Sequence, residues 1–230
     1  MARRPDSPRS LPFPERPDFA VEREATAAGF WPLAGVDEAG RGPLAGPVVA
    51  AAVILDPERI PEGLDDSKRL SPRERERLFG AVMERALAVS VASLPAEAVD
   101  RLNVLQASFS AMCRALRGLT LPPRLALVDG HLLPSGMICE GRAIVGGDRR
   151  SQSIAAASVV AKVVRDRMMG VCGVCDERYG FERHMGYPTP EHKEALARHG
   201  PTERLHRRSF APLRADAPLA PSAPTRVETD

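Results

Sequence analysis

Four acidic residues stand where the chain is expected to leave a strand. Asp37 and Glu38 follow a short apolar run, Asp129 ends a second run, and Asp148 closes a third just before a long helix. In open α/β sheets, reactive groups gather outside strand ends. Mg²⁺ and similar cations take a few carboxylate ligands, and two such ions about 4 Å apart can assist phosphodiester cleavage. A metal site of this kind is one interpretation of the four acids.

Each acid also has a simpler interpretation, and spacing alone does not decide between them. Asp129 and Gly130 form a strong turn dipeptide, and Asp148 could cap a helix. Asp37 and Glu38 could be a solvated strand end. Neighbouring strand residues also point to opposite faces, so these two share a site only if the strand ends or bulges there. The glycines that follow them favour such a break.

Alternating strand and helix patterns predict the elements that must position these acids. Apolar runs indicate strands over 33–37, 48–55, 88–91, 125–129 and 143–145. Capping residues and apolar faces indicate helices that start near Ser71, Asn103, Ser151 and Thr189; the long helix is expected to run to Met169. We therefore predict an α/β fold, a mixed sheet flanked by helices, with a helical C-terminal portion.

The two ends of the chain differ in composition from the centre. Residues 1–30 are rich in proline and in charges of both signs, and residues 213–230 are rich in alanine and proline. Neither stretch has the apolar content to offset the entropy of ordering. We predict disordered extensions over 1–30 and 213–230, around one domain at 31–212.

Composition excludes some classes of protein. Lys and Arg number 32 and Asp and Glu 30, a net charge of +2 that neither demands nor excludes a nucleic-acid partner. There is no apolar run long enough for a membrane span and no signal-peptide pattern, so we expect a cytoplasmic protein without a membrane partner. Cys172 and Cys175 form a CxxC without a second half, which favours incidental thiols over a zinc or redox site.

Several basic and histidine residues have ordinary interpretations. Lys162 is spaced to pair with Asp166 along a helix. The histidines recur every seven residues at positions 192, 199 and 206, but Gly200 and Pro201 break the helix between them. We interpret these histidines as surface residues. The basic run 204–208 could meet a nucleic acid, although such a run is usually a solvated face.

Short motifs occur along the chain in a fixed order. The longest is GVDEAGRGPLAGPV at 35–48. It is followed by DSKRLS at 66–71, NVLQAS at 103–108, VDG at 128–130, GD at 147–148, SIAAAS at 153–158, AKV at 161–163 and HMGYPT at 184–189. These motifs and their order resemble those of the type 2 ribonucleases H, most closely ribonuclease HII. The resemblance covers roughly residues 33–212 and implies a ribonuclease H-like fold.

The resemblance also assigns roles to single residues. It implies Mg²⁺ or Mn²⁺ bound by Asp37, Glu38, Asp129 and Asp148. Gly40, Arg41 and Gly42 match the loop that recognises a ribonucleotide 2′-hydroxyl, the group that distinguishes RNA from DNA. Tyr187 matches the tyrosine that packs on the sugar at the deoxy side of the junction, and Lys68 is expected to meet a phosphate. Phosphate roles for Lys162 and Arg165 are weaker expectations.

The implied activity is endonucleolytic hydrolysis of the RNA strand of RNA–DNA hybrids and cleavage 5′ to ribonucleotides embedded in duplex DNA. The products would carry 5′-phosphate and 3′-hydroxyl ends, by a two-metal mechanism in a monomer. Two departures stand out: Met185 replaces a common lysine, and residues 170–179 do not follow the family pattern. The rivals are the type HIII enzyme, whose extra N-terminal domain needs more than 30 residues, and a non-catalytic binder of hybrids.

Overall fold

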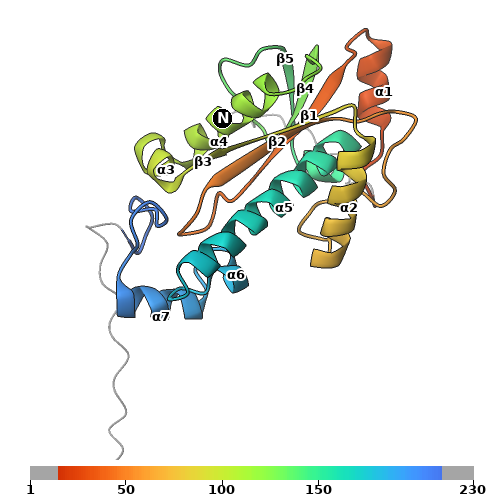
Figure 1. Cartoon of the computed structure of the whole chain (residues 1–230). Coiled ribbons are helices and arrows are strands. Elements are labelled where there is room, and N and C mark those ends of the chain that lie inside the picture. Colours follow the sequence, from red (N-terminus) through yellow and green to blue (C-terminus); the bar gives the residue numbers. More distant parts are fainter. Residues whose placement is uncertain (1–14, 214–230) are drawn as a thin grey trace, which may run out of the picture.

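The computed structural model describes residues 15–213 and builds them around one five-stranded sheet (Figure 1). The strand order is β3 (Ala88–Leu94), β2 (Val48–Ile54), β1 (Leu33–Ala39), β4 (Leu125–Asp129) and β5 (Glu140–Ile144). β1, β4 and β5 run parallel, whereas β2 is antiparallel to both of its neighbours. The mixed sheet expected from the sequence is confirmed. Its three parallel strands bring their carboxyl ends to one edge.

Helices cover both faces of this sheet (Figure 1). α5 (Gln152–Cys175) crosses one face with α2 (Pro72–Arg85) beside it, and α4 (Val104–Arg117) covers the other face with α3 (Ala96–Leu102). Successive side chains along each strand point alternately toward these two helical layers. Ala34, Val36 and other even-numbered residues pack with α4, whereas Ala51 and Val53 pack with α5.

Small residues let α5 lie directly on the sheet. The apolar run Ala155–Ala157 is fully buried, as its lack of a polar face predicts. Gly35 of β1 makes the closest approach, because a Cβ there would lie 2.0 Å from the carbonyl carbon of Ser153. A glycine at 35 therefore sets the spacing between β1 and the first turn of α5.

Part of the expected N-terminal extension is ordered, which corrects the prediction for residues 15–30. Ala20–Ala27 form α1, and the Asp18 carboxylate just before it accepts from the Ala20 N–H at 2.9 Å. Ala25 packs with Leu33 and Leu127 at the end of the sheet. The segment has too few apolar residues to show a helical period, so its order depends on tertiary contacts. The rest of both extensions, 1–14 and 214–230, lies outside the described residues.

The helical C-terminal portion is confirmed and lies beyond the end of α5 (Figure 1). It contains α6 (Phe181–His184) and α7 (Pro190–His199), the latter capped by Thr189 as expected. Met169, Tyr179, Phe181 and Ala195 form its core. The short helices α3 and α6 were not predicted, because seven and four residues are too few to show a period.

Two predictions about this region were wrong. His192 and His206 are buried, at 0 and 3% exposure, and only His199 lies at the surface. The helix does break after His199, but the chain returns and places His206 against α7. α5 also runs past Met169 to Cys175, where Val171 and Val174 face solvent, so the apolar pattern did not mark its end.

The starts of two helices agree with the sequence, whereas β3 runs past the expected 88–91 to Leu94 and β5 covers 140–144 rather than 143–145. Ser71 and Glu74 form a reciprocal capping box, and Asn103 caps α4. The cysteines are all free, with Cys172 and Cys175 in the last turn of α5. Within residues 15–213, every helix is too short or too polar to cross a bilayer.

Candidate metal and nucleic-acid site

Three of the four acids converge at the carboxyl ends of the parallel strands. Val36 pairs with Val128, so Asp37 and Asp129 lie level on adjacent strands. Asp148 lies in a single 3₁₀ turn, Gly147–Arg149, that follows β5. One carboxylate oxygen of each of these three residues lies within 4.8 Å of the others. The sheet therefore gathers ligands that are far apart in sequence.

This acidic cluster is electrostatically strained in the absence of a cation. Burial, and then repulsion from Glu38, Asp129 and Asp148, raises the pKa of Asp37 well above its ordinary value. Burial and the charge of Asp129 raise the pKa of Asp148 to about 7. Carboxylates held this close are the donor set that a hard divalent cation takes, and its charge would remove the repulsion.

Glu38 corrects the expectation that β1 breaks after Asp37. β1 continues to Ala39 with regular pairing, Glu38 opposite Ala50, and the break comes at Gly40. Glu38 therefore projects on the α4 side of the sheet, whereas Asp37 projects on the α5 side. Glu38 pairs with Arg41 at 3.0 Å, while its second carboxylate oxygen is buried without a hydrogen-bond partner. An unsatisfied buried oxygen beside the cluster is what an absent ligand would leave.

Gly40, Arg41 and Gly42 form the start of the loop that joins β1 to β2. Gly40 has φ +95°, a conformation that favours glycine, and a Cβ there would lie 2.1 Å from Nε of Arg165. Gly42 lies beside the Tyr187 ring, at 3.8 Å from the site of a Cβ to Cε1. Gly40 is thus required both by the turn and by its neighbour, whereas a Cβ at Gly42 would make only an ordinary van der Waals contact.

Two buried arginines, Arg207 and Arg165, hold this loop, a role that the sequence did not predict for either of them. The Arg207 guanidinium, 0% exposed, donates to the carbonyls of Gly40, Arg41, Pro43 and Gly46 at 2.6–3.1 Å. Arg207 therefore does not form part of a solvated or DNA-facing basic run. Burial, and then the charge of Arg165, lowers the pKa of Arg207 to about 9, which leaves it charged at neutral pH.

Arg165 acts on the far side of the same loop. It donates to the carbonyls of Pro47, Ala45 and Met185 at 3.0–3.1 Å and is 1% exposed, so it is not available to a phosphate. A basic residue on the apolar face of a long helix was the signal for burial. Arg207 makes five such bonds and Arg165 makes three, an arrangement for which the planar arginine fork is suited.

Tyr187 borders this loop and is tied to the buried histidines. Its ring is 41% exposed, and its carbonyl accepts from Nδ1 of His192 at 2.9 Å. The Thr202 N–H donates to Nδ1 of His206, so Nε2 of His206 carries the proton and donates to Nε2 of His192 at 3.0 Å. The neutral imidazole pair thus joins Tyr187 to the segment that contains Arg207.

Two lysines face the site, and they differ in the acidic residues that surround them. Partial burial alone would lower the pKa of Lys68, but the carboxylates of Asp66, Asp148 and Asp37 raise it. Lys162 pairs with Asp166 at 2.6 Å, as its spacing predicts. Lys68 is therefore the cation drawn to the acidic cluster, whereas Lys162 already has a partner.

One cavity of about 260 Å³ contains most of these groups. Its lining comes from β1, the loop after it, the 66–71 segment, β4 and α5, and includes Asp37, Glu38, Gly40, Arg41, Gly42, Lys68, Asp129, Lys162 and Tyr187. Asp148 joins through its contact with the other acids. Eight of the nine predicted site residues line this cavity, and the ninth lies against it.

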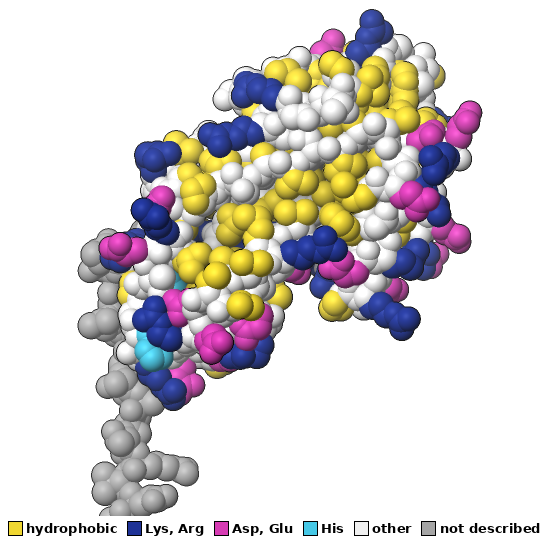
Figure 2. Space-filling model, viewed as in Figure 1, with side chains coloured by type: hydrophobic (Ala, Val, Ile, Leu, Met, Phe, Trp, Pro, Cys, Tyr) yellow, Lys and Arg dark blue, Asp and Glu magenta, His cyan; other side chains and the backbone are white. Residues whose placement is uncertain are grey.

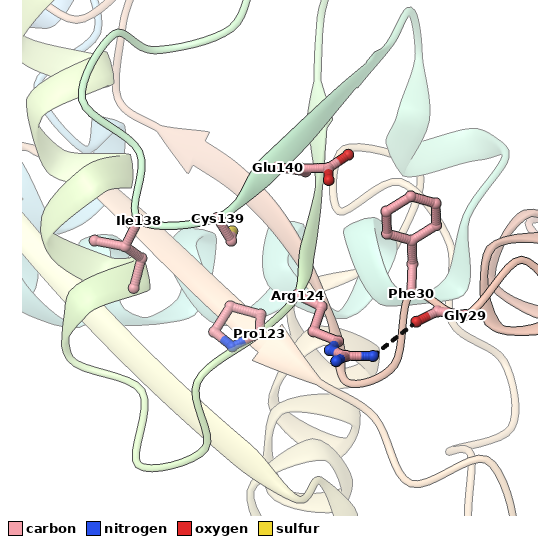
Figure 3. Close-up of a pocket in the computed structure, with 7 residues that line it drawn as sticks. All are labelled: Gly29, Phe30, Pro123, Arg124, Ile138, Cys139 and Glu140. Carbon is pink, nitrogen blue, oxygen red and sulfur yellow. Dashed lines mark hydrogen bonds between the residues drawn. The ribbon is translucent and has the colours of Figure 1, made fainter.

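A wider hollow of about 410 Å³ lies at the opposite ends of the parallel strands, and it lacks this chemistry (Figure 3). Phe30, Pro123 and Ile138 line it, and Arg124 donates to the Gly29 carbonyl across it at 3.2 Å. On the face shown in Figure 2, acidic and basic side chains are mixed around a central apolar area. Size alone therefore does not identify the site, whereas converging carboxylates do.

Comparison with known proteins agrees with this geometry. The sequence model of the family "Ribonuclease HII" matches residues 34–213. This chain belongs to the ribonuclease HII family. A ribonuclease HII of Mesorhizobium japonicum is 62% identical over 93% of each chain, and one of Chelativorans sp. is 59% identical over 91% of this chain and 83% of that one. The ribonuclease H2 structure from Pyrococcus horikoshii matches with a TM-score of 0.67 and 30% identity, covering 79% of this chain and 95% of that one.

Membership of the ribonuclease HII family confirms the ribonuclease H-like fold and the class of enzyme. The protein is a ribonuclease H, an endonuclease that hydrolyses phosphodiester bonds in a nucleic-acid substrate, and its family is metal-dependent. The acidic cluster fits that dependence, because three carboxylates converge and a fourth leaves one oxygen unsatisfied.

Proposed function

We propose that this ribonuclease HII hydrolyses the RNA strand of RNA–DNA hybrids and cuts 5′ to single ribonucleotides embedded in duplex DNA. The products would carry 5′-phosphate and 3′-hydroxyl ends. The observation that carries the proposal is the shared cavity: a glycine loop and Tyr187 border the carboxylates at the ends of β1 and β4. Cleavage chemistry and ribose recognition can therefore act on one nucleotide.

We assign metal binding to Asp37, Glu38, Asp129 and Asp148, with Mg²⁺ or Mn²⁺ as the ion. Two cations held by these four residues would supply an activated water and stabilise the charge on the leaving oxygen. The protein's contribution is to hold the acids in place. Asp129 is oriented when its Oδ1 accepts from the Gly147 N–H at 2.7 Å, and this bond links it to the turn of Asp148.

We assign recognition of the 2′-hydroxyl to the backbone of Gly40, Arg41 and Gly42. The carbonyls of Gly40 and Arg41 turn toward Arg207, which leaves the N–H groups of the loop as the donors for a sugar hydroxyl. Because glycines lack side chains, the sugar can approach this backbone closely. A deoxyribose would lack the hydroxyl that these donors need.

Tyr187 and Lys68 complete the proposed contacts. We assign Tyr187 to packing on the sugar at the deoxy side of the junction, and its exposure beside Gly42 supports this. We assign Lys68 to a backbone phosphate, because it lines the same cavity as the loop and the acids. One chain supplies every group named, so we propose that the enzyme works as a monomer with residues 31–212 as its catalytic domain.

A cleavage assay tests the proposal. We expect cleavage 5′ to the ribonucleotide when a DNA duplex with a single ribonucleotide is incubated with enzyme and Mg²⁺ or Mn²⁺, and cleavage of a long hybrid. An all-DNA duplex should stay intact, and both EDTA and Asp37→Asn should abolish cleavage of the other substrates.

Three outcomes would contradict parts of it. Hybrid cleavage without single-ribonucleotide cleavage would favour the type HIII specificity and sink the recognition assignment. Binding of hybrids without cleavage under either metal would favour a non-catalytic binder. Full activity of Asp37→Asn would contradict the assignment of Asp37 as a metal ligand.

A further inference from the structure

A buried carboxyl group of α1 lies outside both the proposed site and the residues that the family model matches. Glu22 is 0% exposed, and its Oε1 accepts from Oγ of Ser151 at 2.6 Å and from the Ser153 N–H at 2.8 Å. Its Oε2 is also buried, without a hydrogen-bond partner. The family model begins at residue 34, so it does not include this group. Burial of a carboxyl group costs free energy unless its hydrogen bonds compensate, so a buried glutamate in this segment calls for a structural explanation.

Glu22 anchors the first turn of α5. The first amides of a helix have no partner within it, and a carboxylate at that end is favourable. Here the Gln152 N–H donates to the Asp18 carbonyl, the Ser153 N–H to Glu22, and the Ile154 N–H to Oγ of Ser151. The N-terminal segment thus satisfies two of these three amides and orients the hydroxyl that satisfies the third.

The anchored turn continues directly into the turn that carries Asp148. The Ser151 N–H donates to the Gly147 carbonyl at 2.8 Å, and the Gly147 N–H donates to Oδ1 of Asp129. On its other side, the first turn of α5 rests on β1 at Gly35, two residues before Asp37. Two supports, Gly35 and Glu22, therefore fix the start of α5 relative to the acids.

We propose that Glu22 is a positioning residue for Asp148: it holds Ser151 and thereby sets the place of the Asp148 carboxylate in the metal site. This inference rests on the proposed metal ligands. The acceptor oxygen matters more than the charge, because both contacts are hydrogen bonds to Oε1 and burial raises the pKa of the carboxyl group.

Mn²⁺ titration of the full chain without substrate, by calorimetry, tests the inference. Removing an outer-shell partner of a metal ligand typically costs about 10- to 100-fold in affinity, so we expect Glu22→Ala to weaken Mn²⁺ binding about tenfold. Glu22→Gln keeps the acceptor and should stay within about threefold of wild type. In cleavage assays, Glu22→Ala should need more Mn²⁺ for half-maximal rate, and saturating Mn²⁺ should restore the rate.

Two variants separate positioning from general stability. Glu24→Ala removes an exposed glutamate of the same helix, and Leu78→Ala opens the core under α2; both should bind Mn²⁺ as wild type does. In an Asp148→Asn background, Glu22→Ala should add little, since the two changes act on one ligand.

The outcomes distinguish this inference from the proposed function. Wild-type affinity in folded Glu22→Ala would overturn the positioning role alone, as would an equal loss in Leu78→Ala. If Glu22→Ala does not fold, Ser151→Ala removes the hydroxyl that Glu22 holds, and wild-type affinity there would overturn the inference. A wild-type chain that binds no Mn²⁺ would overturn the proposed metal site and, with it, this role.

Discussion

The acidic cluster and the loop beside it are built on opposite electrostatic principles. At Asp37, Asp129 and Asp148, like charges converge with repulsion that the protein does not neutralise. In the loop 40–47, buried Arg207 and Arg165 donate to backbone carbonyls, so these carbonyls are paired within the chain. The first region is incomplete without a cation, whereas the second is complete before any ligand arrives. The metal-dependent chemistry therefore needs an added ion, whereas the proposed recognition would use a preformed surface.

The largest expected effect comes from the acidic cluster. Asp148→Asn should lower cleavage by about 10³-fold or more, because it removes a ligand from the site that stabilises transition-state charge. The same change should raise the thermal midpoint in EDTA, because it relieves like-charge repulsion. Rate measurements and thermal denaturation check the two effects together. An Asp148→Asn variant that loses both activity and stability would contradict the view that repulsion among the acids destabilises the metal-free protein.

Arg207 should give the opposite pattern in the loop. Arg207→Ala leaves four buried carbonyls without a donor, each costing about 1 to 3 kcal/mol, so stability should fall. We expect about a 10²-fold loss of cleavage at single ribonucleotides as the loop loses its shape. Arg208→Ala, next in sequence and exposed, is the matched control and should change neither quantity much. Unchanged denaturation of Arg207→Ala would mean that the carbonyls find other donors.

Tyr187 lies beside Gly42 of the loop, and loss of its proposed contact with the substrate should have a smaller, selective effect. Tyr187→Ala should reduce cleavage of the single-ribonucleotide duplex about tenfold, in line with the 1–3 kcal/mol that stacking contacts contribute. Cleavage of long hybrids should change less, because no deoxyribose flanks the cut. Tyr187→Phe keeps the ring and should retain most of the activity. Equal losses of cleavage on both substrates would contradict a role for Tyr187 in recognising the junction.

The two regions should also respond to pH with opposite sign. Asp148 has a folded pKa of about 7 against about 3.9 unfolded, so its contribution to stability is present below pH 4 and is lost as pH rises toward 7. His206 has a folded pKa of about 4 against about 6.5, so its contribution is present above pH 6.5 and is lost as pH falls toward 4. Each effect amounts to roughly 2 to 4 kcal/mol.

Thermal denaturation in EDTA from pH 4.5 to 8 separates these contributions. Asp148→Asn should flatten the fall in stability toward high pH, and His206→Gln should flatten the fall toward low pH. Saturating Mn²⁺ should remove the first effect and leave the second. If the metal-free protein were most stable at pH 8, repulsion among the acids would not be lowering its free energy of unfolding.

The contrast also explains what the sequence could and could not predict. Asp129 and Asp148 were foreseen because strand ends follow from local apolar runs, and strand order then brings the acids together. Arg207 was not foreseen, because its burial depends on a loop more than 160 residues away in the chain. Glu22 and His206 were missed for the same reason. Local pattern predicts elements and their ends, whereas the partners of a buried charge depend on tertiary structure.

Glu38 shows a subtler limit of the same kind. Its neighbour Asp37 seemed to require a broken strand if both were to reach one site, yet β1 is regular to Ala39. Both residues line one cavity because the sheet edge is open there and Glu38 reaches it from the other face. The alternation of side chains between the two faces of β1 was predicted correctly. The way in which Glu38 reaches the cavity from the other face was not.

The bonds from Arg207 to the loop also have a consequence for the order of synthesis. The loop at 40–46 and all four acids emerge from the ribosome well before residue 207. Until that arginine emerges, the carbonyls of Gly40 and Gly46 lack the donor that buries them. A nascent chain can therefore have translated all four acids while the loop that we propose to recognise the ribonucleotide still lacks its buried donor. The proposed recognition surface would be completed only when residue 207 has been translated.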